Sequence, residues 1–244
     1  VNIELTKTEL RKERKDKLVM RVVSVINELD KELNVFSEKL REWYGLHFPE
    51  INRAVQSHER LAEIIVKYGT RENIKDEELS KLVEKSSGMS LSDTDIHQIQ
   101  QFAEEILRLY GIRKNLAKYL EDLVKTVIPN LSAVAGPMLA ARLLNLAGGL
   151  EKISKMPSST IQLLGAEKAL FRHLKGKGKA PKYGILFGHP LVQQAPKDLK
   201  GKVARLVASK LSLASRLDKF SNKDEGEKLK RELEEQVKKV LNNS

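Results

Sequence analysis

The sequence predicts an all-α protein made of a long antiparallel helical hairpin and a compact helical domain. Apolar residues recur every three or four positions over most of the chain, which is the period of an amphipathic helix. Charged residues make up 32% of the sequence and aromatic residues only 5%, which is typical of long helices with charged faces. Six of the seven prolines lie between Pro129 and Pro196, so a domain boundary is expected near residue 126. The predicted parts are a connector at 1–14, a coiled-coil hairpin at 15–125, a compact domain at 126–222 and a charged terminal helix at 223–244.

The composition excludes several classes of protein. The chain has 244 residues and no cysteine, which rules out disulfides, thiolate metal sites and cysteine nucleophiles. No apolar run reaches the length of a membrane span, and residues 1–17 lack the apolar core of a signal peptide. The chain begins with valine rather than methionine, so it is expected to be a piece of a longer protein. Residues 1–14 have weak helical character and should connect to a segment upstream.

Residues 15–67 carry the pattern of a long helix. The apolar positions are three or four residues apart with one eleven-residue step, as in a coiled coil whose supercoil locally unwinds. Gly45 and Pro49 interrupt the pattern, and proline is suited to the first position of a new helix, so we expect a break there. The apolar stripe consists of Leu18, Val22, Val25, Leu29, Leu33, Phe36, Leu40 and Trp43 before the break, and Ile51, Val55, His58, Ala62 and Ile65 after it.

Residues 69–91 are rich in glycine, serine and charge, which suits the tip of a helical hairpin. One short helix is expected within them, from Asp76 to Lys85. Ser92 and Asp95 then form a capping box in which aspartate replaces the usual glutamate, so a returning helix should begin there.

The returning helix again has apolar residues every three or four positions, with Arg113 as the only misfit. Residues 15–125 hold 18 basic and 20 acidic side chains, and this near-neutral balance favours packing against itself or another protein over nucleic-acid binding. An ordinary helix pair inside a larger bundle is the alternative. The stripe runs through Ile96, Ile99, Ala103, Ile106, Tyr110, Arg113, Ala117, Leu120, Val124 and Val127.

The remaining helices are expected to build the compact domain. Residues 131–150 are small and apolar, which predicts one core helix that ends at Gly148 and Gly149. Residues 221–244 alternate basic and acidic side chains and predict a solvated terminal helix.

Residues 157–220 hold nearly all of the excess positive charge. This segment has 13 Lys and Arg but only three Asp and Glu, a net charge of +10, while the whole chain has +11. Such a concentrated positive field predicts a polyanionic partner, most often nucleic acid. A solvated basic surface that only aids solubility is the alternative.

Several residues of the basic segment are suited to contact phosphate. Lys168, Arg172 and Lys175 are spaced to share one helix face and could follow a phosphate backbone. The hydroxyls of 158–160 are placed to cap a helix that would carry Glu167 on the same face. The loop at 175–182 combines glycine, lysine and proline and should be flexible. A helix is expected from Pro196 to Ser221, with Lys202, Arg205, Lys210 and Arg216 on its polar side.

Other residues of the segment have two interpretations. Leu170 and Leu174 are expected in the core, whereas Phe171 could stack on a base. His189 lies between glycine and proline in a basic context, so we expect it to be exposed, either as a base contact or as a structural residue.

Catalytic and metal-binding patterns are absent from the sequence. The five histidines have no metal-ligand spacing, and the sequence contains no nucleophile elbow or kinase signature. The GKGK at 176–179 lacks the glycine spacing and the hydroxyl residue of a phosphate-binding loop. We therefore expect a non-enzymatic protein with no metal and no cofactor.

The basic segment also resembles a known family. GAEKALFRHLKGKGKAPKYGILFGHPLVQ and KVARLVASKLSLASRLDKFS closely resemble the Nop domain of box C/D ribonucleoproteins. NLSAVAGPMLAARLLNLAGGLEKISKMPSSTIQLLGAEK and the helical hairpin are similar to the same family, so the resemblance covers roughly residues 15–222. Without a long lysine-rich tail, the chain looks archaeal rather than eukaryotic and nucleolar.

The resemblance implies a non-catalytic scaffold of the complex that guides RNA 2′-O-methylation. In that family the hairpin dimerises as a coiled coil, and the Nop domain recognises kink-turn guide RNA together with its small kink-turn-binding, ribosomal-type protein. A further N-terminal domain docks fibrillarin, the methyltransferase that uses S-adenosylmethionine, and we expect this chain to lack that domain. The location would be cytoplasmic in an archaeon and nucleolar in a eukaryote.

The resemblance and the charge pattern together give candidate residues for each role. The expected RNA-binding residues are Gly165, Ala166, Glu167, Lys168, Arg172, Lys175, Lys182, His189, Gln193 and Arg205. The expected dimerisation residues are Leu29, Phe36, Leu40, Ile99, Ile106, Tyr110 and Leu120. Two alternatives stay open: a spliceosomal-type assembly factor with the same domain, and a coiled-coil dimeriser with non-specific RNA affinity.

Overall fold

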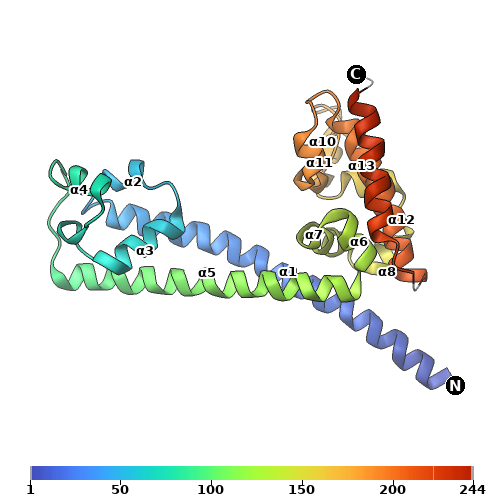
Figure 1. The fold of residues 1–244 in the computed structure, drawn as a ribbon, viewed down its shortest axis with the longest axis horizontal. Coiled ribbons are helices and arrows are strands. Elements are labelled where there is room, and N and C mark those ends of the chain that lie inside the picture. Colours follow the sequence, from blue (N-terminus) through green and yellow to red (C-terminus); the bar gives the residue numbers. More distant parts are fainter. Residues whose placement is uncertain (1, 222, 243–244) are drawn as a thin grey trace. The chain divides into compact units, whose positions relative to one another are not determined.

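The computed structural model describes residues 2–221 and 223–242, with side chains from Lys15 onward. These residues form α-helices and two 3-10 helices and include no strand (Figure 1), which confirms the all-α prediction. The chain divides into two compact units. We call residues 25–116 the hairpin unit, and residues 1–24 with 117–244 the C-terminal unit.

The hairpin unit is built on two long helices that run antiparallel within it. Asp30 pairs with Arg113 and Ser37 approaches Tyr110, so positions on one helix rise as those on the other fall. Residues 2–14 are part of the first helix. The helix therefore begins well before residue 15, where the sequence pattern predicted its start. The helices that contribute to this unit are α1 (Asn2–Tyr44), α2 (Ile51–Ala54), α3 (His58–Tyr68), η1 (Arg71–Asn73), α4 (Glu77–Val83) and α5 (Asp93–Val127).

The break after the first arm is confirmed, but its form differs from the prediction. α1 ends at Tyr44, and the chain resumes helical structure at Ile51 rather than at Pro49. The expected continuous helix to residue 67 is wrong, because Val55 is extended and Ser57 starts a new helix. The Arg60 backbone N–H donates to the Ser57 hydroxyl at 3.3 Å, which satisfies one free donor at the start of α3.

The predicted capping box at the start of α5 is confirmed. The Asp95 N–H donates to the Ser92 hydroxyl oxygen at 3.2 Å, and the Ser92 N–H donates to the Asp95 carboxylate at 3.1 Å. The two reciprocal bonds satisfy backbone donors that the helix itself leaves free. The short helix expected from Asp76 is also present as α4, with the Asp76 carboxylate accepting from the N–H groups of Glu78 and Leu79.

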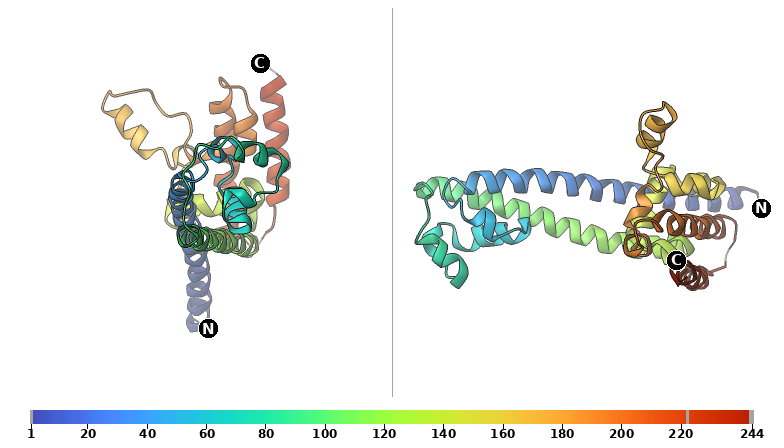
Figure 2. Two further views of the ribbon diagram at one scale, coloured as in Figure 1. Left: turned by 90° about the vertical axis from the view of Figure 1, so that its left-hand side faces the viewer. Right: turned by 90° about the horizontal axis from the view of Figure 1, so that it is seen from above.

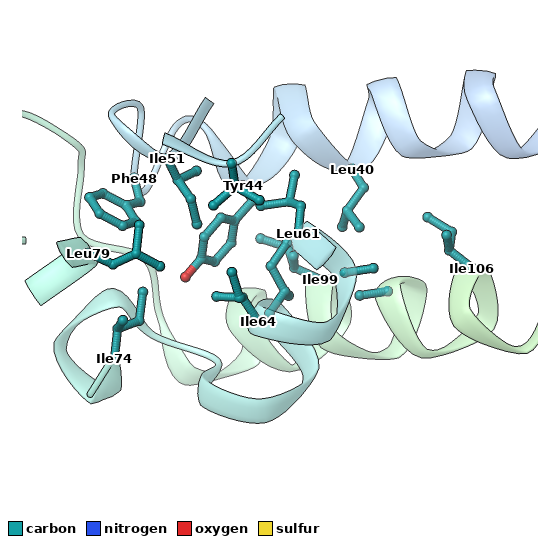
Figure 3. Packing of buried hydrophobic residues seen from close by; sticks show 14 of the residues in the cluster. Leu40, Tyr44, Phe48, Ile51, Leu61, Ile64, Ile74, Leu79, Ile99 and Ile106 are labelled. Carbon is teal, nitrogen blue, oxygen red and sulfur yellow. The ribbon is translucent and has the colours of Figure 1, made fainter. Parts of the chain in front are cut away.

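The tip of the hairpin has a hydrophobic core of its own. Figure 3 shows side chains from α1, α2, α3, α4 and α5 meeting around Tyr44. The Tyr44 ring is fully buried, and its hydroxyl donates to the Gly69 carbonyl oxygen at 3.0 Å. The segment between the arms is therefore packed rather than a bare loop. The core includes Leu40, Tyr44, Phe48, Ile51, Leu61, Ile64, Ile74, Leu79, Ile99 and Ile106.

Arg113, the misfit in the apolar stripe of α5, pairs with an acidic residue of α1. Its Nε donates to the Asp30 carboxylate at 2.9 Å, and both side chains are about two-thirds buried. A polar pair in an otherwise apolar seam favours one register of the two helices over others.

The C-terminal unit is centred on one long helix. α12 packs against α6, α8, α9 and α13 and buries small and β-branched residues along these faces. The helices that follow the hairpin are α6 (Pro129–Ala135), α7 (Pro137–Ala147), α8 (Leu150–Lys155), α9 (Ser158–Leu163), α10 (Glu167–Leu174), η2 (Ile185–Gly188), α11 (Pro190–Gln194), α12 (Lys200–Phe220) and α13 (Gly226–Asn242).

Three predicted helix boundaries in this unit are wrong. Residues 131–150 form two helices, because Gly136 has a φ of 79° and Pro137 begins the next helix. The hydroxyls of 158–160 do not cap α9, since Pro157 occupies the cap position. α12 begins at Lys200, not at Pro196. The predicted helix end at Gly148 is confirmed by its left-handed conformation.

The terminal helix α13 is part of the core, so the expectation of a solvated helix is wrong. Leu229, Leu233 and Val237 are buried, and the helix packs against α6 and α12. Lys210, expected on the polar side of α12, is buried instead and pairs with Glu232 of α13 at 2.5 Å. The alternating charges lie on the outer face of α13. They dominate the sequence pattern, so the apolar stripe of Leu229, Leu233 and Val237 was not recognised.

No helix in the described part of the chain is long and apolar enough to cross a membrane. Within the same residues, no cluster of three or more His, Asp or Glu is placed to hold a metal ion.

Candidate nucleic-acid interface

A basic arm stands away from the rest of the C-terminal unit. We define this basic arm as residues 165–183, which comprise α10 and the turns on either side of it. Both views in Figure 2 show the helix and the loop after it, drawn in yellow to orange, projecting from the neighbouring helices of this unit. Every residue of α10 keeps part of its side chain exposed. The arm is thus a surface feature with room for a partner.

The two ends of the basic arm are joined by hydrogen bonds. The Gly184 N–H donates to the Gln162 carbonyl oxygen at 2.9 Å, and the Ile185 N–H donates to the Leu164 carbonyl oxygen at 2.7 Å. The Gln162 side chain donates to the Lys182 carbonyl oxygen at 2.6 Å. These bonds fix the base from which the arm projects.

The arm presents the cations that the sequence predicted for phosphate contact. Lys168 and Arg172 are exposed on α10, and Lys175 and Lys182 are exposed in the loop that follows. The Lys175 ammonium also lies 4.4 Å from the centre of the Phe171 ring. Exposed cations beside an exposed aromatic ring are a common combination in surfaces that bind single-stranded RNA.

The remaining arm residues among the candidates have structural contacts. Gly165 has a φ of 83°, and its N–H donates to the Glu167 carboxylate at 2.7 Å. Glu167 therefore holds the turn into α10, and Ala166 lies between them at the start of the helix. The expected alignment of Glu167 with α9 is wrong, because the turn separates the two helices.

Leu174 is not in the core, contrary to the prediction. Its side chain is 73% exposed, and the neighbouring Phe171 is 58% exposed. The apolar spacing on α10 is that of a core helix, but the arm projects beyond the body that would have covered it. The apolar edge of α10 is therefore left available to a partner.

His189 is buried, so the expectation that it is exposed is wrong. It is 5% exposed and lies at the start of α11. Its Nε2 is 3.0 Å from the Val134 carbonyl oxygen, and its Nδ1 accepts from the Leu191 N–H at 3.3 Å. Both ring nitrogens are occupied within the protein, so the ring joins α6 to α11 and is not presented to RNA.

We expect replacement of His189 with alanine to destabilise the fold by about 1 to 3 kcal/mol, because it removes a helix cap and a buried hydrogen bond. Burial lowers the pKa of His189 below its ordinary value, although the bond to Val134 raises it. His189 therefore binds a proton more readily in the unfolded chain than in the folded one. Its contribution to the free energy of unfolding is complete above about pH 6.5 and is lost as the pH falls below that value.

Urea unfolding at pH 7.5 and pH 5.5 measures this effect. The loss caused by His189→Ala should be larger at pH 7.5. His97→Ala, which removes an exposed histidine, should have little effect at either pH. Equal losses for the two variants would contradict the structural role.

The other RNA-binding candidates lie outside the basic arm. Gln193 is exposed on α11 and Arg205 is exposed on α12. Sequence reasoning did not assign a role to Tyr183 at the end of the arm, Phe187 in η2 or Lys200 at the start of α12, although the Phe187 ring contacts the other two side chains. The only signal in the sequence was two aromatic residues four positions apart beside the GHP stretch.

Most of the expected dimerisation residues pack inside the chain. Leu40, Ile99 and Ile106 are buried in the hairpin core, and Leu120 is buried in the C-terminal unit. These four side chains are covered by other residues of the same chain. Leu29, Phe36 and Tyr110 are only partly buried.

The hairpin unit also has a half-exposed apolar stripe, and Leu29 and Phe36 belong to it. Its side chains recur every seven residues on α1 and every seven residues on α5, which is the heptad spacing of a coiled coil. Phe102 contacts both Phe36 and Trp43, with ring centres 6.0 and 6.5 Å apart, so the two halves are adjacent. The stripe consists of Leu29, Phe36 and Trp43 on α1 with Phe102, Leu109 and Leu116 on α5.

Comparison with known proteins gives consistent matches over most of the chain. An uncharacterized NOP5 family protein of Methanocaldococcus jannaschii is 47% identical over 229 residues, covering 88% of this chain and 55% of that protein. Nucleolar protein 56 of Schizosaccharomyces pombe is 37% identical over 244 residues, covering 92% of this chain and 49% of that protein. The chain thus spans about half the length of these relatives.

The fold has a counterpart among solved structures. A chain from the crystal structure of a fibrillarin/Nop5p complex matches with a TM-score of 0.59 and 25% sequence identity, covering 98% of this chain and 74% of that one. The family model described as Nop, snoRNA binding domain, fibrillarin matches residues 25–239. The chain therefore belongs to the Nop family.

Proposed function

We propose that this chain is a non-catalytic, RNA-binding scaffold of a box C/D ribonucleoprotein. The observation that carries the proposal is the basic arm, which projects Lys168, Arg172, Lys175 and Lys182 from a hydrogen-bonded base. Membership of a family described as snoRNA-binding supports RNA as the polyanion. The RNA surface in this proposal is the C-terminal unit, because residues 157–220 hold a net charge of +10.

The proposal includes a composite target. The arm offers both cations and the exposed apolar side chains of Phe171 and Leu174, which suit a surface that is part nucleic acid and part protein. We propose that kink-turn guide RNA, with its small kink-turn-binding protein already bound, is that target. Fibrillarin is proposed as a partner of the complete protein, because this chain resembles one chain from the crystal structure of a fibrillarin/Nop5p complex.

A titration with box C/D kink-turn RNA tests the proposal. The chain is added to the RNA alone and to the RNA bound to its small kink-turn-binding protein, and complexes are resolved by gel shift. The proposal predicts tight binding to the preformed complex and much weaker binding to the RNA alone. Equal, weak binding to any RNA would contradict it and would leave a dimeriser with non-specific RNA affinity.

We propose further that the hairpin unit dimerises through the half-exposed stripe. Trp43 is 40% exposed, and the heptad spacing of the stripe on both helices suits a second pair of helices. Trp43→Glu should weaken the dimer at least about tenfold, because it buries an unpaired charge in an apolar contact. Val35→Glu is the control, since Val35 is exposed on α1 but lies off the stripe.

Sedimentation equilibrium measures both variants against the unaltered chain. The proposal predicts a dimer for the unaltered chain and for Val35→Glu, and monomer for Trp43→Glu at the same concentration. A monomeric unaltered chain, or a dimer that tolerates Trp43→Glu, would contradict the proposed face.

A further inference from the structure

A pair of stacked aromatic rings lies beside the base of the basic arm. The ring centres of Tyr183 and Phe187 are 5.5 Å apart, and the ring planes differ by 14°. Tyr183 is the last residue of the arm, and Phe187 lies in η2. We call Tyr183, Phe187 and Lys200 the aromatic shelf.

The shelf has a positioned cation. The Lys200 ammonium lies 4.9 Å from the centre of the Phe187 ring and donates to the Gln193 carbonyl oxygen at 2.9 Å. One of its three N–H groups is used in this bond, so two are free for an anion. The side chain of Lys182 passes 3.5 Å from the position of a methyl group at Gly201, and its residue is exposed. The stem of Lys182 therefore lies beside the residue that follows Lys200.

The shelf is also open. Phe187 is 46% exposed, which is unusual for a residue that serves only the core. Gly188 follows it, and a methyl group there would meet no described atom within 4 Å. Part of the stack is thus accessible to a ligand.

Stacked, partly exposed rings with adjacent lysines are the features of a site for one unpaired nucleotide. Bases stack on exposed aromatic side chains, and lysines take the phosphates that follow. A base-paired nucleotide could not use the site, because both faces of its base are covered by neighbours in the duplex.

We propose that the aromatic shelf binds one unpaired nucleotide of the RNA, with the base against the rings and a phosphate on Lys200 and Lys182. The inference rests on the proposed RNA-binding function and adds a second contact, separate from α10. It assigns to the shelf a preference for unpaired over paired RNA, whereas the cations of the arm bind either form.

Two variants of Phe187 test the shelf. Phe187→Leu keeps an apolar side chain but removes the ring, and Phe187→Trp keeps a ring and introduces a fluorophore. Each is titrated with a short single-stranded RNA and with a duplex of the same length. Phe187→Leu should bind the single strand about 5- to 100-fold more weakly and the duplex unchanged.

Phe187→Trp gives a direct readout. It should keep the affinity for the single strand, and its emission should be quenched by the single strand but not by the duplex. The unaltered chain, whose single tryptophan is Trp43, supplies the background signal. If Phe187→Leu proves unstable in thermal unfolding, the quenching of Phe187→Trp decides the question alone.

The outcomes separate this inference from the proposed function. If Phe187→Leu binds the single strand normally while Lys168→Glu/Arg172→Glu loses affinity, the shelf is overturned and the RNA-binding function stands. Equal losses for single strand and duplex would also overturn the stacking role. If the unaltered chain binds neither RNA, the shelf is overturned, whereas the proposed function is decided by the titration with kink-turn RNA bound to its small protein.

Discussion

Replacing Gly184 with alanine is expected to be the most damaging single substitution at the base of the arm. A Cβ at this position would overlap the Leu164 carbonyl oxygen and approach the Leu163 carbonyl oxygen at 2.9 Å. Both atoms belong to the backbone and cannot turn away, so the bonds that join 162–164 to 184–185 must break. We expect a loss of about 1 to 3 kcal/mol of stability, together with weaker RNA binding because the arm loses its fixed base.

Urea unfolding and hydrogen exchange at residues 184 and 185 measure this effect. Gly188→Ala is the matched control, because a methyl group at Gly188 meets open space. That variant should keep normal stability and normal exchange. A Gly184→Ala protein as stable as Gly188→Ala, with slow exchange at both amides, would show that the base of the arm is not fixed as described.

Reversing two charges on α10 is expected to cause the largest loss of RNA affinity. Lys168 and Arg172 are exposed and one helical turn apart, so one phosphate backbone could contact both. Lys168→Glu/Arg172→Glu turns two attractions into repulsions and should weaken binding by about 10- to 100-fold near 0.1 M salt. The protein should remain folded, because neither side chain is buried.

The control for this experiment changes the net charge by the same amount elsewhere. Lys238 and Lys239 are exposed on α13, and Lys238→Glu/Lys239→Glu also lowers the net charge by four. A specific surface on the arm predicts a small effect for this control. Equal losses in the two double variants would mean that only the total charge matters.

The hairpin could be predicted from the sequence because local signals agree there. Apolar residues repeat at the helical period, Gly45 and Pro49 mark the break, and Ser92 with Asp95 marks the start of the return. Each signal acts over a few residues, so no knowledge of distant contacts is needed. Arg113 interrupts the apolar pattern of α5 because it pairs with Asp30 on α1, the other helix of the hairpin.

The burial of individual residues could not be predicted in the same way. Leu174 has the spacing of a core residue but lies on a projecting arm. His189 has the flanking residues of a loop but is buried and bonds to Val134 of α6. The charges of α13 hid its buried stripe. In all three cases tertiary packing, which the local sequence does not encode, decides burial.

The candidate site was predicted in part. Cations leave a visible signal in the sequence, so Lys168, Arg172, Lys175 and Lys182 could be named as candidates, and all four are exposed. The stack of Tyr183 and Phe187 depends on the fold at the base of the arm, where Gln162 and Leu164 bind the returning chain. The residues expected to dimerise were chosen by their helical spacing, and that same spacing buries Leu40, Ile99 and Ile106 within the hairpin unit.

The salt dependence of RNA binding tests the central claim most directly. The affinity of the unaltered chain for kink-turn RNA bound to its small protein is measured between 0.05 and 0.2 M salt. Four phosphate contacts by the arm predict that log K falls against log salt with a slope of about −3. Lys168→Glu/Arg172→Glu should give a slope shallower by about 1.5 to 2. A flat dependence, or a slope that the double variant leaves unchanged, would show that the basic arm does not bind RNA.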